Sequence, residues 1–473
     1  MKPITILAGL FALASLCASA PAESLSQFNN PLYQGQDPWM IYHDGFYYLC
    51  QSAQGGGSAV HVSKSRTLLD QGVKIKVWED QNYRGVFAPE LHYLRGKWYI
   101  YFCADVKELG WKRKAVVLEA DTPDPQGSYT CRGVLFTGVK GELYGANDFT
   151  VMEENGQLYA FWGSLNDPGR GVMAARMDSP IRITADRSPV GLPAEGPRIL
   201  RHGDKIILTG AGGAFASKGY HIRAQVWNPS KGALTDRDAW TPLGILFKAT
   251  DDVWGPSRGA FVPSADGKET WMVYHSKIFP ASDNPFRQVN IKPITFSADG
   301  LPQLGTPPSP LEFLPLPSGD PGLGEVYQAE TATLTNGAKP AATEKGFQGA
   351  GYVTGLDQRG ASVTFKVTAP AAGVYLATLR YSSGKMVPAE QQSHPKRADP
   401  TLRLPKRETL SIQVNGKRIL QTALDRTTNF SNWMNQAEQL PLNAGENTIT
   451  YQVAEGDTGG VNLDYIAVYL LKN

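Results

Sequence analysis

The stretch that decides the fold runs from Ala194 to Gly210 and reads AEGPRILRHGDKIILTG. A carboxylate and a tight Gly-Pro turn come first, and two short apolar runs then flank a polar turn at Gly203. A polar glycine turn between two β-rich runs is typical of a hairpin. We therefore expect this stretch to begin a β-meander, with Glu195 at the entry of its first strand.

The same pattern occurs at five places along the chain. In each, a polar turn is followed by a β-rich run, and the turn glycines are Gly45, Gly96, Gly156, Gly203 and Gly267. The turns recur about every 50 to 60 residues, which is the usual length of a four-stranded propeller blade. The repeat predicts an all-β fold that begins with a five-bladed β-propeller over residues 23–304.

Acidic residues recur at one offset from these turns. The positions eight residues before the five turn glycines are Asp37, Ala88, Asp148, Glu195 and Gly259. Innermost strands lie side by side around a propeller axis, so equivalent positions converge on it. Acids on solvated loops would fall at random offsets. The common offset therefore predicts a central pocket lined by Asp37, Asp148 and Glu195.

Short motifs surround these positions and continue to the end of the propeller. They are Gln36-Asp37-Pro38-Trp39, Phe87-Ala88-Pro89-Glu90, Asn147-Asp148, Glu195-Gly196-Pro197, Val253-Trp254-Gly255-Pro256 and Tyr274-His275. Together they resemble the blade motifs of family 43 glycoside hydrolases, in particular the α-L-arabinofuranosidase branch, over about residues 30 to 315. The resemblance implies a five-bladed propeller that hydrolyses glycosidic bonds.

Separated carboxylates suit this chemistry. Glycoside hydrolysis needs one protonated acid at the leaving oxygen and one carboxylate that activates water or attacks carbon. Asp37 and Glu195 belong to non-adjacent blades, and a wide separation that admits a water predicts inversion, as the resemblance also implies. We expect Asp37 as general base and Glu195 as general acid. Asp148 would keep Glu195 protonated and oriented.

The resemblance assigns further residues to the pocket. Phe87 would form a stacking wall, Arg287 would contact substrate hydroxyls, and His275 would face a cation on the propeller axis. A structural histidine and a surface salt bridge are the alternatives for His275 and Arg287. Phe87 stands where relatives commonly have Trp, and Ser257-Arg258-Gly259 replaces a Gly-His pair, which places a cation near the pocket. Both departures leave the exact sugar open.

A second domain follows a segment rich in Pro and Gly at residues 305–324, which predicts a linker or a strap along the propeller rim. Short alternating strands over residues 325–473 predict a jelly-roll-like β-sandwich. The opening Tyr327-Gln328-Ala329-Glu330 and the late Val461-Asn462-Leu463-Asp464 are similar to motifs of carbohydrate-binding module families 6 and 35.

That second resemblance implies two sites. A structural Ca²⁺ would be held by Gln328, Glu330 and Asp464, whose oxygens suit this hard cation, although Gln328 stands where the family usually has Glu. The resemblance also implies that sugar contacts Tyr352, Trp433 and Asn462. Each of these side chains could instead be a core or loop-packing residue.

The N-terminus and the composition concern location and partners. Residues 1–22 contain an apolar run and an Ala-Pro-Ala site, which predict a secretory signal. Lipoprotein anchoring at Cys17 is disfavoured because Leu16 is bulky. No other apolar stretch reaches the ~18 residues of a membrane span. A net charge of +2 predicts no attraction to nucleic acid or membranes.

Three cysteines remain after the signal, and an odd number cannot form a closed disulfide framework. We expect structural roles for Cys50, Cys103 and Cys131.

The sequence therefore predicts a secreted or periplasmic, monomeric, inverting exo-α-L-arabinofuranosidase that acts on plant cell-wall arabinan or arabinoxylan. A β-xylosidase or galactan-active hydrolase of the same family is the nearest alternative. A non-catalytic polysaccharide-binding protein is the alternative from another class, and the intact set of three carboxylates argues against it.

Overall fold

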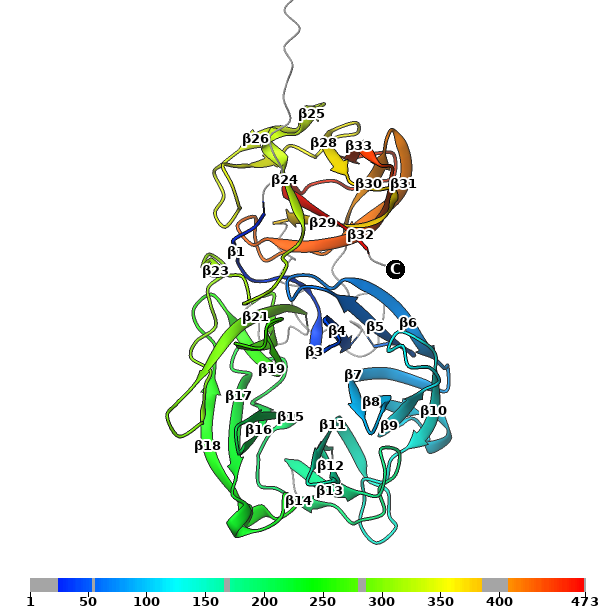
Figure 1. Ribbon diagram of the computed structural model, residues 1–473, viewed down its shortest axis with the longest axis vertical. Helices are drawn as coiled ribbons and strands as arrows, with labels where there is room; N and C mark the ends of the chain where they lie inside the picture. The colour runs from blue at the N-terminus through cyan, green and yellow to red at the C-terminus, as the bar shows by residue number, and fades with distance from the viewer. Residues whose placement is uncertain (1–23, 53–55, 166–170, 280–285, 385–406, 472–473) are drawn as a thin grey trace, which may run out of the picture.

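The computed structural model describes residues 24–52, 56–165, 171–279, 286–384 and 407–471. The predicted signal at 1–22, with Cys17, lies outside these ranges. The described chain forms a propeller of five sheets followed by a β-sandwich (Figure 1). The predicted all-β class and order of domains are confirmed. Helical structure in the described ranges consists of short 3₁₀ turns, namely η1 (Lys107–Leu109), η2 (Pro229–Lys231), η3 (Arg237–Ala239) and η4 (Ala329–Thr331).

The first three blades are four-stranded antiparallel sheets. Blade one contains β3 (Gln36–His43), β4 (Phe46–Ser52), β5 (Ala59–Ser65) and β6 (Val73–Glu79). Blade two contains β7 (Tyr83–Leu94), β8 (Lys97–Val106), β9 (Lys112–Ala120) and β10 (Tyr129–Val134). Blade three contains β11 (Gly145–Glu154), β12 (Gln157–Leu165), β13 (Val172–Met177) and β14 (Ser188–Pro189).

The last two blades complete the ring around a central opening in the ribbon (Figure 1). Blade four contains β15 (Glu195–His202), β16 (Lys205–Gly212), β17 (His221–Trp227) and β18 (Trp240–Phe247). Blade five contains β19 (Trp254–Pro263), β20 (Thr270–Lys277), β21 (Arg287–Phe296) and, from the start of the chain, β2 (Tyr33–Gln34). A short strand β22 (Pro302–Gln303) also pairs with β21.

Strand β2 closes the propeller. Tyr33 pairs with Val289 in an antiparallel register. Asn30 reinforces this closure, because its side chain donates to the carbonyl oxygen of Ile291 and accepts from the N–H of Ile291, both at 2.9 Å. The first described strands and the last blade are therefore joined by backbone and side-chain hydrogen bonds.

Each innermost strand begins with an irregularity in its pairing. The register shifts follow Gln36, Phe87, Asn147, Glu195 and Ser257. The next residue has a positive φ in every blade, and these residues are Asp37, Ala88, Asp148, Gly196 and Arg258. Five equivalent β-bulges thus turn the chain where it reaches the axis.

This register corrects the predicted alignment of the blades. Asp37 and Asp148 are equivalent, as predicted, but Glu195 lies one residue before the equivalent position, and on blade five that position is Arg258 instead of Gly259. On blade four the reason is the turn: His202 pairs with Lys205, so Gly203 is the first central turn residue, whereas Gly45 is the second. On blade five Pro263 pairs with Thr270, so the turn that contains Gly267 is longer.

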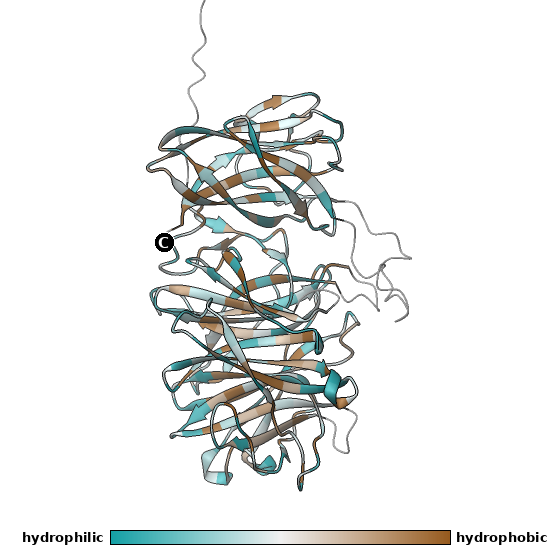
Figure 2. Ribbon diagram, turned by 90° about the vertical axis from the view of Figure 1, so that its right-hand side faces the viewer, coloured by the Kyte–Doolittle hydropathy of each residue, from teal (hydrophilic) through white to brown (hydrophobic). Residues whose placement is uncertain are grey.

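The second domain packs two sheets face to face. The first contains β26 (Lys339–Ala341), β27 (Tyr352–Thr354), β34 (Asn462–Leu470), β29 (Gly373–Ser382), β32 (Met434–Leu442) and β24 (Glu325–Gln328). The second contains β25 (Thr333–Thr335), β28 (Ser362–Ala369), β33 (Gly445–Gln452), β30 (Glu408–Val414) and β31 (Lys417–Leu424). Hydrophilic and hydrophobic bands alternate along strands of both domains (Figure 2), as expected for sheets with one buried face.

The segment between the domains is packed against blade one. It contains β23 (Leu314–Pro315), which pairs with β1 (Gln27–Phe28). Asp320 accepts hydrogen bonds from the Thr67 hydroxyl at 2.6 Å and the Leu68 N–H at 2.9 Å. Residues 305–324 therefore include a strap on the propeller.

Other sequence expectations concern cysteines and membranes. The described cysteines Cys50, Cys103 and Cys131 are all free, and the first two are buried. In the described part of the chain, no helix has the length and apolar character needed to cross a membrane.

We expect Asn30→Ala to lower the free energy of unfolding by about 2–4 kcal/mol, because it leaves a buried N–H and a buried carbonyl of Ile291 without partners. Thermal or chemical unfolding of the full chain measures this change. Asn82→Ala, at an exposed turn, is the control and should unfold like wild type. Equal stabilities of the two variants would contradict the proposed importance of the closure.

Candidate active site

The predicted carboxylates meet around one guanidinium group. Arg258 of blade five places Nη2 2.6 Å from Asp148 Oδ1 of blade three, and Nε 3.6 Å from Asp37 Oδ1 of blade one. On blade four, the N–H of Gly196 donates to Asp148 Oδ2 at 3.1 Å, which brings the neighbouring Glu195 to the same place. Blade three is adjacent to neither blade one nor blade five in the ring, so contacts that join Asp148 to these two blades lie at the centre.

Asp37 is held in the form that a base requires. Ser52 donates its hydroxyl to Asp37 Oδ2 at 2.7 Å, and Ser52 is itself fixed by the N–H of Ala88 at 2.7 Å. Burial opposes ionisation of Asp37, but Arg258, Arg287 and the Ser52 hydrogen bond outweigh it and hold the pKa of Asp37 below its usual range. Asp37 is therefore ionised at neutral pH.

Asp148 is more deeply buried and serves as a junction. Only 1% of the residue is exposed. Asn147 donates its side-chain amide to Asp148 Oδ2 at 2.8 Å. Burial raises the pKa of Asp148 to about 6, against the attraction of Arg258 and with the repulsion of Glu195. This carboxyl group therefore titrates much closer to neutral pH than an ordinary aspartate does.

Glu195 differs from both because it is only partly buried. The hydroxyl of Tyr220 donates to Glu195 Oε1 at 2.8 Å. Tyr220 is 1% exposed, and its ring stacks on His275 with centroids 6.1 Å apart. A rigid buried side chain thus orients the carboxyl group that faces the solvent. Tyr220 could not be predicted as a site residue, because it follows a glycine in a loop and has no local sequence signal.

A buried ion pair lies one step further along the innermost strands. Arg198 Nη1 contacts Glu90 Oε1, and His92 Nε2 lies 3.0 Å from Glu90 Oε2. Glu90 and Arg198 are 0% and 1% exposed, and buried charges at this depth need partners. This pair was not among the predicted site residues, although Glu90 and Arg198 both lie three residues after the start of the bulge in their strands.

The two substrate contacts predicted for the propeller have different surroundings. Arg287 is 5% exposed, so a surface salt bridge is excluded, and its Nη2 donates to the carbonyl of Phe215 at 2.8 Å. The Arg287 guanidinium also lies 6.0 Å from the ring of Tyr220. Phe87 is partly buried, with the Arg113 guanidinium 4.6 Å from its ring centroid. Phe215 is 47% exposed and adds an aromatic face beside Arg287 that the sequence analysis missed.

The residues on the axis do not fit the predicted cation at His275. Its Nδ1 accepts the N–H of Asp37 at 3.0 Å, while Nε2 is buried without a hydrogen-bond partner. Burial, Arg287 and Arg258 hold the pKa of His275 far below its usual range. These guanidinium groups would repel a metal ion beside a neutral imidazole. Among the described residues, no group of three or more His, Cys, Asp or Glu could hold a metal. The positive charge is supplied by Arg258.

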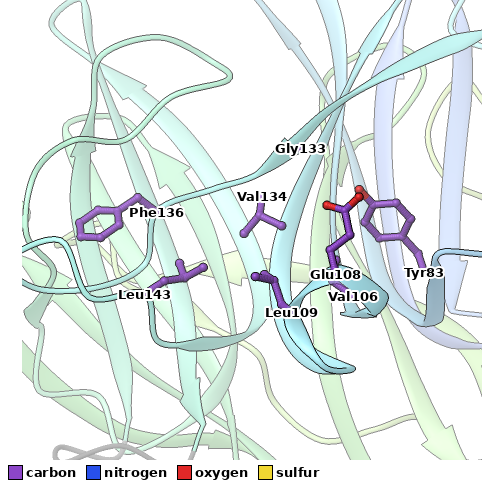
Figure 3. A pocket seen from close by; sticks show the side chains of 8 residues that line it. All are labelled: Tyr83, Val106, Glu108, Leu109, Gly133, Val134, Phe136 and Leu143. Carbon is purple, nitrogen blue, oxygen red and sulfur yellow. The ribbon is translucent and has the colours of Figure 1, made fainter.

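A separate pocket opens between blades two and three. Its lining residues are Tyr83, Val106, Glu108, Leu109, Gly133, Val134, Phe136 and Leu143. Figure 3 shows Tyr83 and Glu108 on one side of it and Phe136 and Leu143 on the other. None of the predicted catalytic residues lines this pocket.

Comparison with known proteins accounts for both domains. The family model for glycosyl hydrolases family 43 matches residues 28–302, more than half of the chain. The chain belongs to this family. The model for carbohydrate binding module family 35 matches residues 325–387 of the same chain.

Several curated relatives of this family 43 protein are named arabinofuranosidases. An extracellular exo-α-(1→5)-L-arabinofuranosidase from Streptomyces avermitilis is 28% identical over 323 residues, which are 61% of this chain and 66% of that relative, just under two thirds. Alpha-L-arabinofuranosidase 43 from Humicola insolens is 26% identical over 69% of this chain and 74% of that relative. Among solved structures, the α-L-arabinofuranosidase from Lactobacillus brevis matches 60% of this chain and 97% of its own, with a TM-score of 0.54 and 24% identity. That last likeness supports the fold alone.

The predicted sugar contacts of the family 35 module are buried. Tyr352 and Trp433 are 2% and 1% exposed, and their rings meet edge to face with centroids 5.3 Å apart. Trp433 donates its indole N–H to the carbonyl of Lys345 at 2.8 Å. Asn462 is 5% exposed. Tyr352 and Trp433 therefore pack beneath a loop and present no open ring face, which favours the core or loop-packing alternative over the predicted contact with sugar.

The three predicted calcium ligands have different surroundings. Asp464 is fully buried and accepts from Arg380 Nε at 3.1 Å and from the N–H of Gln348. Glu330 Oε1 accepts from the N–H of Gly351 at 3.1 Å. Gln328 packs against the adjacent Gly349, and its Oε1 is buried without a hydrogen-bond partner. Gln328 and Glu330 thus line one turn and fit a cation, whereas Asp464 already has a cationic partner.

We expect Ser52→Ala to move the acidic limb of the pH dependence of kcat/KM to higher pH. The hydroxyl stabilises ionised Asp37, so its loss raises the pKa of Asp37, and a base is lost as pH falls through that pKa. The pH profile of hydrolysis measures this shift. The control is Ser128→Ala, which removes a similar hydroxyl from the exposed Asp121 and should leave the profile unchanged. An unmoved acidic limb in Ser52→Ala would count against Asp37 as the base.

Proposed function

We propose that this family 43 glycoside hydrolase is an inverting exo-α-L-arabinofuranosidase acting on plant cell-wall arabinan or arabinoxylan. The observation that carries the proposal is a pair of unlike carboxyl groups at one centre: Asp37 is buried, ionised and bound by Ser52, whereas Glu195 is partly exposed and bound by Tyr220. The names of the two curated relatives support the choice of sugar.

We assign one task to each group. Asp37 takes a proton from a water molecule as that water attacks the anomeric carbon, and Glu195 protonates the leaving glycosidic oxygen. In the proposed mechanism the sugar binds between blades one and four, with the water and the leaving group on opposite faces of its ring, so that the configuration inverts. Asp148 orients the strand of Glu195 through its hydrogen bond with the N–H of Gly196.

Location and partners follow from the same comparison. The relatives from Streptomyces avermitilis and Streptomyces chartreusis are named extracellular, which supports secretion or a periplasmic location. The partner of both domains is polysaccharide, since the second domain matches a carbohydrate binding module. We propose a monomer in solution.

The first test is hydrolysis of p-nitrophenyl α-L-arabinofuranoside, β-D-xyloside and β-D-galactoside. We expect turnover of the arabinoside, with β-L-arabinofuranose as the first anomer seen by NMR. Asp37→Asn should lower kcat by about 10²–10⁴-fold, the usual contribution of an acid or base. Asp204→Asn, on an exposed turn of blade four, is the control.

Other results would change the proposed sugar, the stereochemistry or the class of protein. Turnover of the xyloside or galactoside alone would replace the proposed sugar and keep the reaction. Release of the α-anomer first would exclude inversion. Silence on all three would favour an unusual linkage or a binding protein. Glu195→Gln should abolish hydrolysis and leave polysaccharide binding intact, and loss of both would make Glu195 a structural residue.

We also propose that Gln328 and Glu330 hold a structural Ca²⁺ in the family 35 module. Calcium binds oxygen ligands, and binding to the folded state alone raises the melting temperature with ligand concentration. We expect added CaCl₂ to stabilise EDTA-treated protein and Gln328→Ala to reduce that effect, with MgCl₂ as the control. Identical melting curves with EDTA and with calcium would contradict the proposal.

A further inference from the structure

Among the residues that the structure describes, Arg258 is the only side chain that forms ion pairs with both Asp37 and Asp148. It is 6% exposed and lies on β19, the innermost strand of blade five. Its φ of 59° lies in the left-handed region, which disfavours residues with a side chain. Such strain persists only where the surrounding structure over-determines it, and it is concentrated at functional sites.

Blade four leaves space for this guanidinium. A Cβ at Gly196 would lie 2.4 Å from Arg258 Nη1 and 2.6 Å from its Cζ, distances that atoms do not tolerate. The φ of Gly196 is also positive, at 57°. Gly196 therefore has two roles at this bulge. It adopts the positive φ of the blade-four turn, and its lack of a Cβ leaves room for the Arg258 side chain at the axis.

The charges around Arg258 explain why a cation is needed. Three carboxyl groups and one phenol interact electrostatically with Arg258, namely those of Asp37, Asp148, Glu195 and Tyr220. The other charged or titratable groups of the site are the cations Arg198 and Arg287 and the buried imidazole of His275. Asp37 and Asp148 lie in a site from which water is largely excluded, where like charges repel strongly. A planar guanidinium can point separate nitrogens at separate carboxylates, which an ammonium group cannot do with the same fixed geometry.

We propose that Arg258 is a positioning residue: its guanidinium bridges Asp37 and Asp148 across the ring and holds the base relative to the strand that carries Glu195, in the place of an axial metal ion. The inference rests on the proposed hydrolytic function. Arg258 also couples blade one to blade three through blade five, whichever sugar the enzyme hydrolyses.

The catalytic test uses Arg258→Ala and Arg258→Lys on whichever of the three glycosides wild type hydrolyses. We expect folded Arg258→Ala to lose at least about 100-fold in kcat, with a smaller change in KM, because the reacting carboxyl groups lose their alignment. Guanidinium ion, added below denaturing concentration, should restore part of kcat to Arg258→Ala and none to Asp37→Asn. Arg201→Ala, an exposed arginine of blade four paired with Glu154, is the control.

A second test does not need turnover. In a double-mutant cycle with Arg258→Gln and Asp148→Asn, the losses in melting temperature should be strongly non-additive, since either change breaks the same bridge. The exposed pair Arg201→Gln and Glu154→Gln should be nearly additive. Folded Arg258→Ala with kcat within a few-fold of wild type, or an additive Arg258 and Asp148 cycle, would overturn the inference. Failure of wild type on the arabinoside alone would leave this second test standing.

Discussion

The structure depends on bringing three carboxyl groups to one axis without letting their charges repel. Asp37 and Asp148 are almost withdrawn from water, where the cost of two nearby negative charges is large. One guanidinium, from Arg258, touches both. The rest of the centre follows from that arrangement: a glycine on blade four where a side chain would collide, and unequal surroundings that separate the ionisation of otherwise similar acids.

Much of the fold could be predicted because its signals are local. A polar glycine turn between β-rich runs specifies a hairpin wherever it occurs, and five repetitions specify five blades. The closure could not be predicted, because Tyr33 pairs with Val289 at the far end of the propeller and a two-residue strand leaves no pattern. Counting from Gly203 gave a register error of one residue, since the glycine occupies a different position in that turn.

The candidate site was only partly predictable for a related reason. Acids near blade entries are visible in the sequence, but their partners come from elsewhere: Ser52 from a neighbouring strand and Tyr220 from a loop. Burial cannot be predicted residue by residue from the sequence. Trp433 is therefore a candidate sugar contact in the sequence, whereas in the structure it is buried beneath a loop. An aromatic residue type predicts a large contact area, but the packing of distant segments decides whether the ring faces the core or a ligand.

The seam between the two domains has a consequence for modularity. The residue before the closing strand, Leu32, accepts a hydrogen bond from the N–H of Asn435 in the sandwich at 2.6 Å. One apolar cluster contains Tyr33 and Leu69 of the propeller together with Val326 and Tyr465. The carbohydrate-binding module therefore covers the join of the ring. Removing the module would expose the apolar residues around the pairing of β2 with β21, which closes the catalytic propeller. An exchange of this module during evolution would therefore require compensating changes in the propeller surface that it covers.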